Sequence, residues 1–242
     1  MKRSINPLRT LADLLYPRAC AGCGRPVHGP DAALCPDCRL RVPAVSLPYC
    51  DVCGDPVAGD VPGAYTCTWC RRTKPAFAWA RSAVRYAGPV RPCIRNLKYH
   101  AGFWSLPEIE QWLAALWPTC PADARTADAI VPVPLHWTRR IRRTYNQATL
   151  VSGVLSRLSG IPVRPLWLWR LRRTGTQTHL TAAQRARNVS GVFGVPSRRA
   201  VRGRRIILVD DVMTTGATLN ECARALRAAG AEAVMAITVA RG

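Results

Sequence analysis

Eight cysteines in the first third of the chain have the spacing of metal ligands. They form four Cys-x2-Cys pairs, which are Cys20 and Cys23, Cys35 and Cys38, Cys50 and Cys53, and Cys67 and Cys70. Each pair can present two thiolates to one tetrahedral ion, and two pairs complete a four-sulfur zinc site. The spacing therefore predicts two structural Zn²⁺ sites. Because four thiolates leave no open coordination position, neither ion is expected to act in catalysis.

The spacing does not determine which two pairs bind the same ion. A sequential arrangement joins neighbouring pairs, and a cross-brace interleaves them. Redox-active cysteines or an iron–sulfur cluster are the alternative interpretations. Gly24 and Gly54 follow the second cysteine of a pair, where a tight turn favours glycine. The three scattered cysteines, Cys93, Cys120 and Cys222, are expected to be small buried residues and not reactive thiols.

A second group of residues suited to chemistry lies at 205–218. An apolar run delivers Asp210 and Asp211 to the C-terminal edge of an expected strand, where α/β sheets bind ligands. The turn that follows, Thr-Thr-Gly-Ala-Thr at 214–218, opens a helix whose first N–H groups and dipole attract a phosphate. The acid pair suits sugar hydroxyls, so a phosphorylated sugar fits both halves of the motif.

The chain carries a formal net charge of +21, and this charge is unevenly distributed. Residues 76–242 hold twenty-five basic and eight acidic groups, whereas residues 1–75 hold ten and six. Residues 129–209 contain sixteen arginines and neither Asp nor Glu. Such a field attracts the phosphates of a nucleotide, a sugar diphosphate or a nucleic acid strand. A codon bias toward Arg explains the shortage of Lys, but it does not explain the missing acids.

The length of 242 residues is enough for one α/β domain and a small module. No apolar run approaches the roughly 20 residues that cross a bilayer, and charged residues interrupt the apolar positions of residues 1–16. We therefore expect a short amphipathic helix at 1–16, no membrane insertion and a cytoplasmic location. Eleven cysteines without an export signal also favour metal binding over disulfides.

The apolar periodicity predicts the elements that position these groups. Strands are expected at 79–86, 129–133, 163–169, 205–209 and 233–239, and helices at 90–97, 106–117, 146–158 and 217–229. Ser105 is the expected cap of the second helix, and Trp167 and Trp169 are expected in the core. Strands that alternate with helices favour a mostly parallel sheet flanked by helices. The chain thus divides into a zinc-binding module at 1–75 and an α/β domain at 76–242.

The stretch at 210–218 resembles the signature of type I phosphoribosyltransferases, which bind 5-phosphoribosyl-1-diphosphate (PRPP). The resemblance implies that Asp210 and Asp211 contact the ribose hydroxyls. It implies a PRPP-binding turn made of Val212, Met213, Thr214, Thr215, Gly216, Ala217 and Thr218. It also implies an α/β fold of the type I phosphoribosyltransferase kind, whose mostly parallel sheet follows the zinc ribbon in the sequence.

The wider pattern resembles the ComF (ComFC) family associated with natural competence. After the cysteine pairs, motifs similar to those of the family follow in the same order at 94–99, 131–135, 145–148, 176–178 and 187–189. By analogy with the fold, Pro134 and Leu135 belong to a diphosphate loop, Lys98 adds a charge, and Arg172 and Arg173 belong to a loop that closes over the substrate. Mg²⁺ would accompany PRPP, bound largely by the oxygens of the substrate.

Three functions fit this pattern. In the first, an acceptor that the sequence does not identify displaces diphosphate from C1 of the sugar, with Asp210, Asp211 and Lys98 as catalytic residues. In the second, the chain is a non-catalytic component that binds single-stranded DNA during uptake, together with competence proteins, through arginines and aromatic rings such as Trp169. In the third, the chain senses PRPP without turnover.

Overall fold

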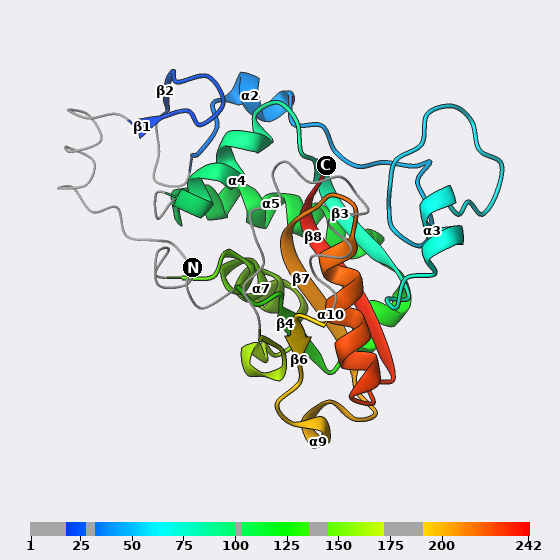
Figure 1. The fold of residues 1–242 in the computed structure, drawn as a ribbon. Helices are drawn as coiled ribbons and strands as arrows, with labels where there is room; N and C mark the ends of the chain where they lie inside the picture. Colours follow the sequence, from blue (N-terminus) through cyan, green and yellow to red (C-terminus); the bar gives the residue numbers. More distant parts are fainter. Residues whose placement is uncertain (1–17, 28–31, 100–102, 136–144, 172–190) are drawn as a thin grey trace.

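The computed structural model describes residues 18–27, 32–99, 103–135, 145–171 and 191–242 (Figure 1). At its centre lies a four-stranded sheet in the order β3-β8-β7-β4, in which every neighbouring pair is parallel. Its strands are β3 (Ala80–Arg85), β8 (Ala233–Arg241), β7 (Arg205–Met213) and β4 (Ala129–Pro132). The two inner strands, β7 and β8, contain long apolar runs at 206–209 and 233–240, because both faces of the sheet are covered there.

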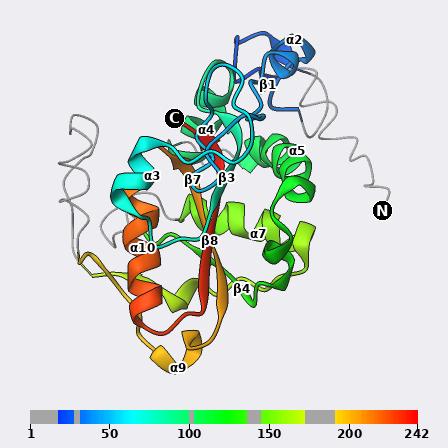
Figure 2. The ribbon, with the colours of Figure 1, turned by 90° about the vertical axis from the view of Figure 1, so that its right-hand side faces the viewer.

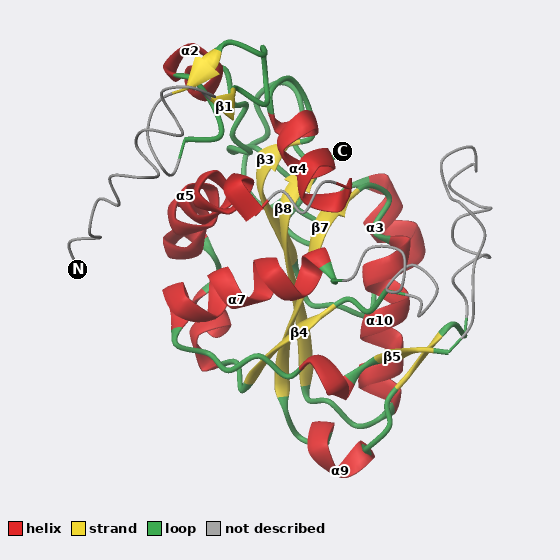
Figure 3. Cartoon of the chain, turned by 90° about the vertical axis from the view of Figure 1, so that its left-hand side faces the viewer, coloured by secondary structure: helices red, strands yellow, loops and turns green. Residues whose placement is uncertain are grey.

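Helices cover both faces of the sheet, which is seen edge-on in Figure 2 and Figure 3. One face packs against α5 (Leu106–Leu116), α7 (Gln147–Ser159) and α4 (Val90–Tyr99), and the other packs against α10 (Ala217–Ala228). Among the described residues, none of the helices has the length and apolar character needed to span a bilayer. The expected α/β fold, with a parallel sheet flanked by helices, is confirmed.

The remaining elements are short. The cysteine-rich module contains β1 (Arg18–Ala19), β2 (Pro26–Val27), α2 (Pro36–Leu40) and α3 (Thr68–Thr73). The α/β part adds β5 (Trp169–Arg170), β6 (Phe193–Gly194) and α9 (Arg198–Val201). It also has 3₁₀ turns at Phe103–Ser105, Trp117–Thr119, Ala122–Thr126 and Pro165–Trp167. In Figure 1, α9 lies at the end of the sheet opposite the C-terminus.

The cysteine-rich module wraps around the β3 edge of the sheet, so that its two halves join opposite cores. Cys20, Cys35 and Cys38 belong to the core that contains α5 and α7, and Cys50, Cys53 and Cys70 belong to the core that contains α10. Between the halves, the Val45 N–H donates to the Ala83 carbonyl at 3.1 Å, and the Arg85 N–H donates to the Pro43 carbonyl at 2.7 Å. This pairing covers a strand edge that would otherwise expose unpaired backbone groups.

The prediction of a strand at 163–169 is wrong. Val163 makes one bridge to Ile130, and the chain then enters the 3₁₀ turn at Pro165–Trp167. Pro165 has no N–H to give to a strand ladder, so the pairing cannot continue there. Trp169, which was expected in the core, is 51% exposed.

Two smaller expectations concern helix ends. Ser105 was expected to cap α5, but its side chain makes no capping hydrogen bond and is buried at the end of a 3₁₀ turn. That prediction is also wrong, because the preceding turn already gives Ser105 helical backbone angles. The helix expected at 1–16 lies outside the described residues.

A buried carboxylate joins the first half of the module to α5. The Glu108 side chain is fully buried and accepts a hydrogen bond from Arg39 Nη2 at 2.6 Å. It also accepts the backbone N–H of Leu34 at 3.3 Å. A buried charge is costly unless it is paired and hydrogen-bonded. These contacts therefore fix the position of the first cysteine cluster on the α/β body.

Replacing Glu108 with Gln should lower the free energy of unfolding by about 2 kcal/mol, because a hydrogen bond to a charged group contributes roughly 1.5–3 kcal/mol. Chemical denaturation followed by tryptophan fluorescence measures the change. Glu110→Gln on the same helix is the control. Its pair with Arg157 is solvent-exposed, so the expected loss is below about 0.5 kcal/mol. Equal losses in the two variants would contradict the role given to Glu108.

Candidate zinc and phosphate sites

The eight cysteines form two clusters. One contains Cys20, Cys23, Cys35 and Cys38, the other contains Cys50, Cys53, Cys67 and Cys70, and the sulfurs of each lie within 4.8 Å of one another. The sulfurs of Cys23 and Cys35 are 3.7 Å apart, as are those of Cys53 and Cys67. Tetrahedral zinc with Zn–S bonds of about 2.3 Å places its sulfurs about 3.8 Å apart. The clusters therefore fit structural zinc, with neighbouring pairs sharing an ion and no interleaving.

The two clusters repeat the same local structure. In the first, the Cys35 N–H donates to the sulfur of Cys20 at 3.2 Å, and in the second, the Cys67 N–H donates to the sulfur of Cys50 at 3.3 Å. The glycine that follows the second cysteine has a φ of 77° in one cluster and 65° in the other. Glycine adopts this left-handed conformation without steric cost. The module is thus a doubled ribbon, which we call the first and second ribbon.

The three scattered cysteines are buried outside both clusters. Burial raises the pKa of Cys93 to about 12 and the pKa of Cys120 to about 11. Burial also raises the pKa of Cys222 well above its ordinary value. A thiol that stays protonated at neutral pH is a poor nucleophile and a poor metal ligand. The expectation that these three are small core residues is confirmed.

The acid pair lies within a strand and not beyond it. β7 continues past Val209 to Met213, so Asp210 and Asp211 are strand residues near its C-terminal end, and both are partly exposed. The Asp210 carboxylate accepts the Asp211 N–H at 2.8 Å. The pair therefore stands at the edge of the sheet where parallel α/β folds bind ligands.

The turn from β7 to α10, which we call the phosphate turn, encloses a small cavity of 30 Å³. Its lining consists of Asp210 and residues 212–219. Gly216 has a φ of 76°, and a Cβ at this position would lie 2.7 Å from Met213 Cε. The positive φ favours glycine, because other residues adopt this conformation only with strain, whereas the flexible Met213 side chain could move away from a Cβ. Because the first turn of α10 lines the cavity, its N–H groups and the helix dipole favour an anion there.

The neighbouring strand ends at the same edge of the sheet. β4 is parallel to β7, and the N–H of Val133, the next residue, donates to β7 at 2.8 Å. The side chain of Asn146 donates to the Val133 carbonyl at 3.0 Å and also caps α7 by accepting the Ala148 N–H. Pro134 and Leu135, which are partly exposed, follow Val133 in the chain. These two residues and the acid pair therefore lie at the ends of two adjacent strands, β4 and β7.

Three further residues of the expected site lie outside the described part of the structure. Lys98 belongs to α4, but its side chain is not among the described groups. Arg172 and Arg173 fall in the segment 172–190, which is not described. Their roles at the site stay predictions from sequence.

Arg241 contacts the phosphate turn and pairs with Asp55 of the second ribbon, and no motif in the sequence marks either residue. The Arg241 guanidinium at the end of β8 donates to the carbonyls of Met213, at 3.1 Å, and Thr214. It also pairs with Asp55 of the second ribbon at 3.1 Å. Arg241 can be recognised in the sequence as the charged residue that ends an apolar strand. Asp55 has no comparable signal, because its partner is far away in the chain.

Replacing Cys35 with Ser should remove about one of the two zinc ions per chain, because a serine hydroxyl is a poor substitute for a thiolate in a four-sulfur site. Elemental analysis of the purified protein measures the metal content. Cys93→Ser removes a buried thiol outside both clusters, so this control should retain about two ions. An unchanged zinc content in the Cys35 variant would reject the first cluster as a metal site.

Comparisons with known proteins agree with this organisation. The sequence matches the double zinc ribbon domain over residues 11–74 and the phosphoribosyl transferase domain over residues 136–242. It is 34% identical over 231 residues to Competence protein F of Haemophilus influenzae, covering 92% of this chain and 96% of that protein.

Two further relatives are similar over most of the chain. DNA utilization protein YhgH of Escherichia coli is 33% identical over 221 residues, covering 89% of this chain and 86% of that protein. Competence protein ComFC of Bacillus subtilis is 25% identical over 215 residues, covering 88% of this chain and 85% of that protein. The resemblance inferred from the motifs is confirmed. The chain therefore belongs to the competence protein F family, with a double zinc ribbon followed by a phosphoribosyltransferase-type domain.

Proposed function

We propose that this chain binds PRPP at the phosphate turn, with the ribose hydroxyls on Asp210 and Asp211. The supporting observation is the cavity of the turn, whose lining combines a helix N-terminus, threonine hydroxyls and a carboxylate. Amides and hydroxyls at 214–218 suit the 5-phosphate, and carboxylates accept hydrogen bonds from sugar hydroxyls. In this proposal, residues 76–242 form the ligand-binding domain and residues 1–75 form the zinc module.

The proposed ligand would bring Mg²⁺ to the site. The carboxylates of Asp210 and Asp211 are hard oxygen donors of the kind that suit this ion alongside phosphate oxygens. The bound ion would neutralise charge on the diphosphate. The chain at Pro134 and Leu135 would hold the diphosphate, and Lys98 and two arginines, Arg172 and Arg173, would add positive charge.

The proposed reaction is transfer of the phosphoribosyl group to an acceptor. A nucleophilic atom of the acceptor forms a bond to C1 of the sugar while the C1–O bond breaks. The bonding electrons leave with the diphosphate, and the acceptor loses a proton to water. Positive charge develops on the sugar ring during this displacement. The nearby carboxylates of Asp210 and Asp211 would stabilise that charge.

We further propose that the protein takes part in handling DNA during natural competence. The support is the similarity to proteins named Competence protein F, Competence protein ComFC and DNA utilization protein YhgH. The role would involve other competence proteins as partners and a cytoplasmic location. The PRPP site and the role in DNA uptake are compatible within one chain.

Single-stranded DNA binding is a second candidate function, which an exposed aromatic ring among basic residues favours. In the segment 164–171, Trp169 is 51% exposed, Leu171 is 62% exposed and Arg164 is also exposed. Bases stack on such rings while arginines contact the phosphates. Some arginines of the acid-free segment are neutralised by acids from outside it: Arg204 by Asp128, and Arg205 by Asp123 and Glu232.

The double substitution Asp210→Asn with Asp211→Asn should weaken PRPP binding about 100-fold or more. It removes two charged acceptors, and a hydrogen bond to a charged group contributes roughly 1.5–3 kcal/mol. Isothermal titration calorimetry with Mg²⁺ present measures the affinity. Asp60→Asn changes an exposed acid of the second ribbon and should leave the affinity unchanged. Undiminished binding by the folded double variant would overturn the proposed site.

The second candidate predicts that affinity for single-stranded oligonucleotides falls about tenfold or more between about 50 and 200 mM salt, because neutralised phosphates release counterions. Fluorescence anisotropy of a labelled oligonucleotide measures the change. Trp169→Ala should weaken binding about tenfold through lost stacking, whereas Trp117→Ala should not. Affinity that is independent of salt would exclude this function. Competition by PRPP in the same assay would place both ligands on one surface.

A further inference from the structure

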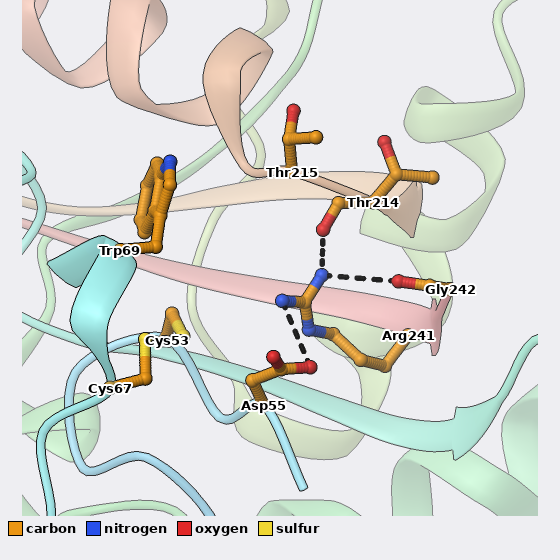
Figure 4. A pocket seen from close by; sticks show the side chains of 8 residues that line it. All are labelled: Cys53, Asp55, Cys67, Trp69, Thr214, Thr215, Arg241 and Gly242. Atoms are coloured by element: carbon orange, nitrogen blue, oxygen red, sulfur yellow. Dashed lines mark hydrogen bonds and ion pairs between the residues drawn. The ribbon is translucent and has the colours of Figure 1, made fainter. Parts of the chain in front are cut away.

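The two halves of the proposed PRPP site are held in place in different ways. The phosphate turn is held by Arg241, whose guanidinium donates to backbone carbonyls of the turn and pairs with Asp55 of the second ribbon at 3.1 Å (Figure 4). Residues 134–135, which are proposed to hold the diphosphate, lie just beyond the neighbouring strand β4. Two consecutive residues, Tyr145 and Asn146, make the contacts that fix this second half.

The chain leaves the sheet at a peptide group that Asn146 holds. Val133 still pairs with β7, because its N–H donates to the Val209 carbonyl at 2.8 Å. Pro134 has no N–H, so it cannot extend this ladder. The direction of the chain beyond the sheet therefore depends on the planar peptide group between Val133 and Pro134. Asn146 Nδ2 donates to the carbonyl of this peptide group at 3.0 Å and so fixes its orientation.

Asn146 is itself fixed by the start of α7. Its Oδ1 atom accepts the Ala148 N–H at 3.1 Å, so the side chain caps the helix while its amide group holds the Val133 carbonyl. The helix packs on the sheet through buried side chains such as Val151 and Leu155. An element of the hydrophobic core thus sets the position of the peptide group that leads out of β4.

Tyr145 makes a corresponding contact to the end of α4. Its hydroxyl donates to the Leu97 carbonyl at 2.5 Å. Leu97 lies in the last turn of α4, where backbone carbonyls have no partner within the helix. The Tyr145 ring also contacts Phe103, with the two ring centres 5.2 Å apart. The hydroxyl therefore holds the end of the helix that carries Lys98, the residue after Leu97.

We propose that Tyr145 and Asn146 are positioning residues for the diphosphate of PRPP. Because they are consecutive, they fix the end of α4 and the end of β4 relative to each other. Lys98 on the first element and residues 134–135 beyond the second are the groups proposed to contact the diphosphate. Tyr145 and Asn146 act through these groups and do not bind the ligand themselves. This inference rests on the proposed function, because it assigns the two residues to one half of the same site.

Calorimetry with two ligands separates positioning of the diphosphate from stability of the fold. PRPP with Mg²⁺ carries the diphosphate, whereas ribose 5-phosphate lacks it and would depend on the phosphate turn and the acid pair. We expect the zinc-loaded wild-type protein to bind PRPP about tenfold or more tightly than ribose 5-phosphate, because charge-assisted hydrogen bonds to the diphosphate add affinity. The ratio of the two affinities is then compared between the wild-type protein and each variant.

Two conservative substitutions remove the positioning contacts. Asn146→Ser should weaken PRPP binding about fivefold, the effect of losing one neutral hydrogen bond, and should leave ribose 5-phosphate binding unchanged. Serine caps a helix about as well as asparagine, but its shorter side chain cannot also reach the Val133 carbonyl. Tyr145→Phe keeps the ring beside Phe103 and removes only the hydroxyl, so it should weaken PRPP binding by a similar factor.

Ser156→Ala is the matched control at the other end of α7. It removes a side-chain hydrogen bond of 2.7 Å to the Ile161 carbonyl, in the last turn of the helix. The control should lower the melting temperature and leave the affinities for both ligands unchanged. Thermal melting of all three variants shows whether a loss of affinity follows a loss of stability.

A loss of PRPP affinity with unchanged ribose 5-phosphate affinity in both variants supports the proposal. Unchanged PRPP binding in either variant overturns the role given to that residue. Equal losses for both ligands would assign the residue to the stability of the fold, which also overturns its role. If the wild-type protein binds the two ligands equally well, the positioning proposal fails and the phosphate turn stands. If it binds neither ligand, the proposed function itself fails.

Discussion

Close packing around Gly216 connects the phosphate turn to the second ribbon, and the proposed chemistry depends on this contact. The positive φ of 76° turns the chain from β7 into α10 within three residues of the strand end. Met213 and Trp69 fill the space that a Cβ would need. These neighbours pack against the turn whose backbone amides are proposed to bind the phosphate. Arg241 adds a second connection, because it pairs with Asp55 and donates to the carbonyls of the turn.

The zinc clusters extend the hydrophobic cores on which the sheet depends. Each ribbon contributes buried cysteines to a different core, one beside α5 and α7 and the other beside α10. Zinc binding would contribute folding free energy to a module that has few apolar residues of its own. Backbone hydrogen bonds to β3 hold residues 43–45, which connect the two ribbons, on the edge of the sheet. The ion pair between Arg39 and Glu108 holds the first ribbon on α5. Metal binding in the module is thus coupled to the geometry of the α/β domain on both faces of the sheet.

Features that depend on neighbouring residues could be predicted from the sequence, and features that join distant segments could not. The cysteine pairs and the 205–218 motif each specify local structure and chemistry, so the ribbons and the strand–turn–helix unit follow from them. The division into modules at 75 and 76 stays a prediction. Arg241 with Asp55 and Arg39 with Glu108 are separated by long stretches of chain, and no local pattern marks either pair. The apolar periodicity at 163–169 predicts a strand that does not form, because Pro165 has no N–H for a strand ladder and ends the pairing.

Groups of opposite charge lie on the two sides of the phosphate turn. The α/β domain carries most of the positive charge, and the phosphate turn adds a helix dipole, so anions favour that side. On the other side, the second ribbon faces the turn with Asp55 and with two cysteines of its cluster, Cys53 and Cys67. Thr214 and Thr215 separate the two environments by the width of one turn. The phosphate turn therefore lies between a positively charged domain and the hydrogen-bond acceptors of the zinc ribbon, and Arg241 joins the two sides through Asp55.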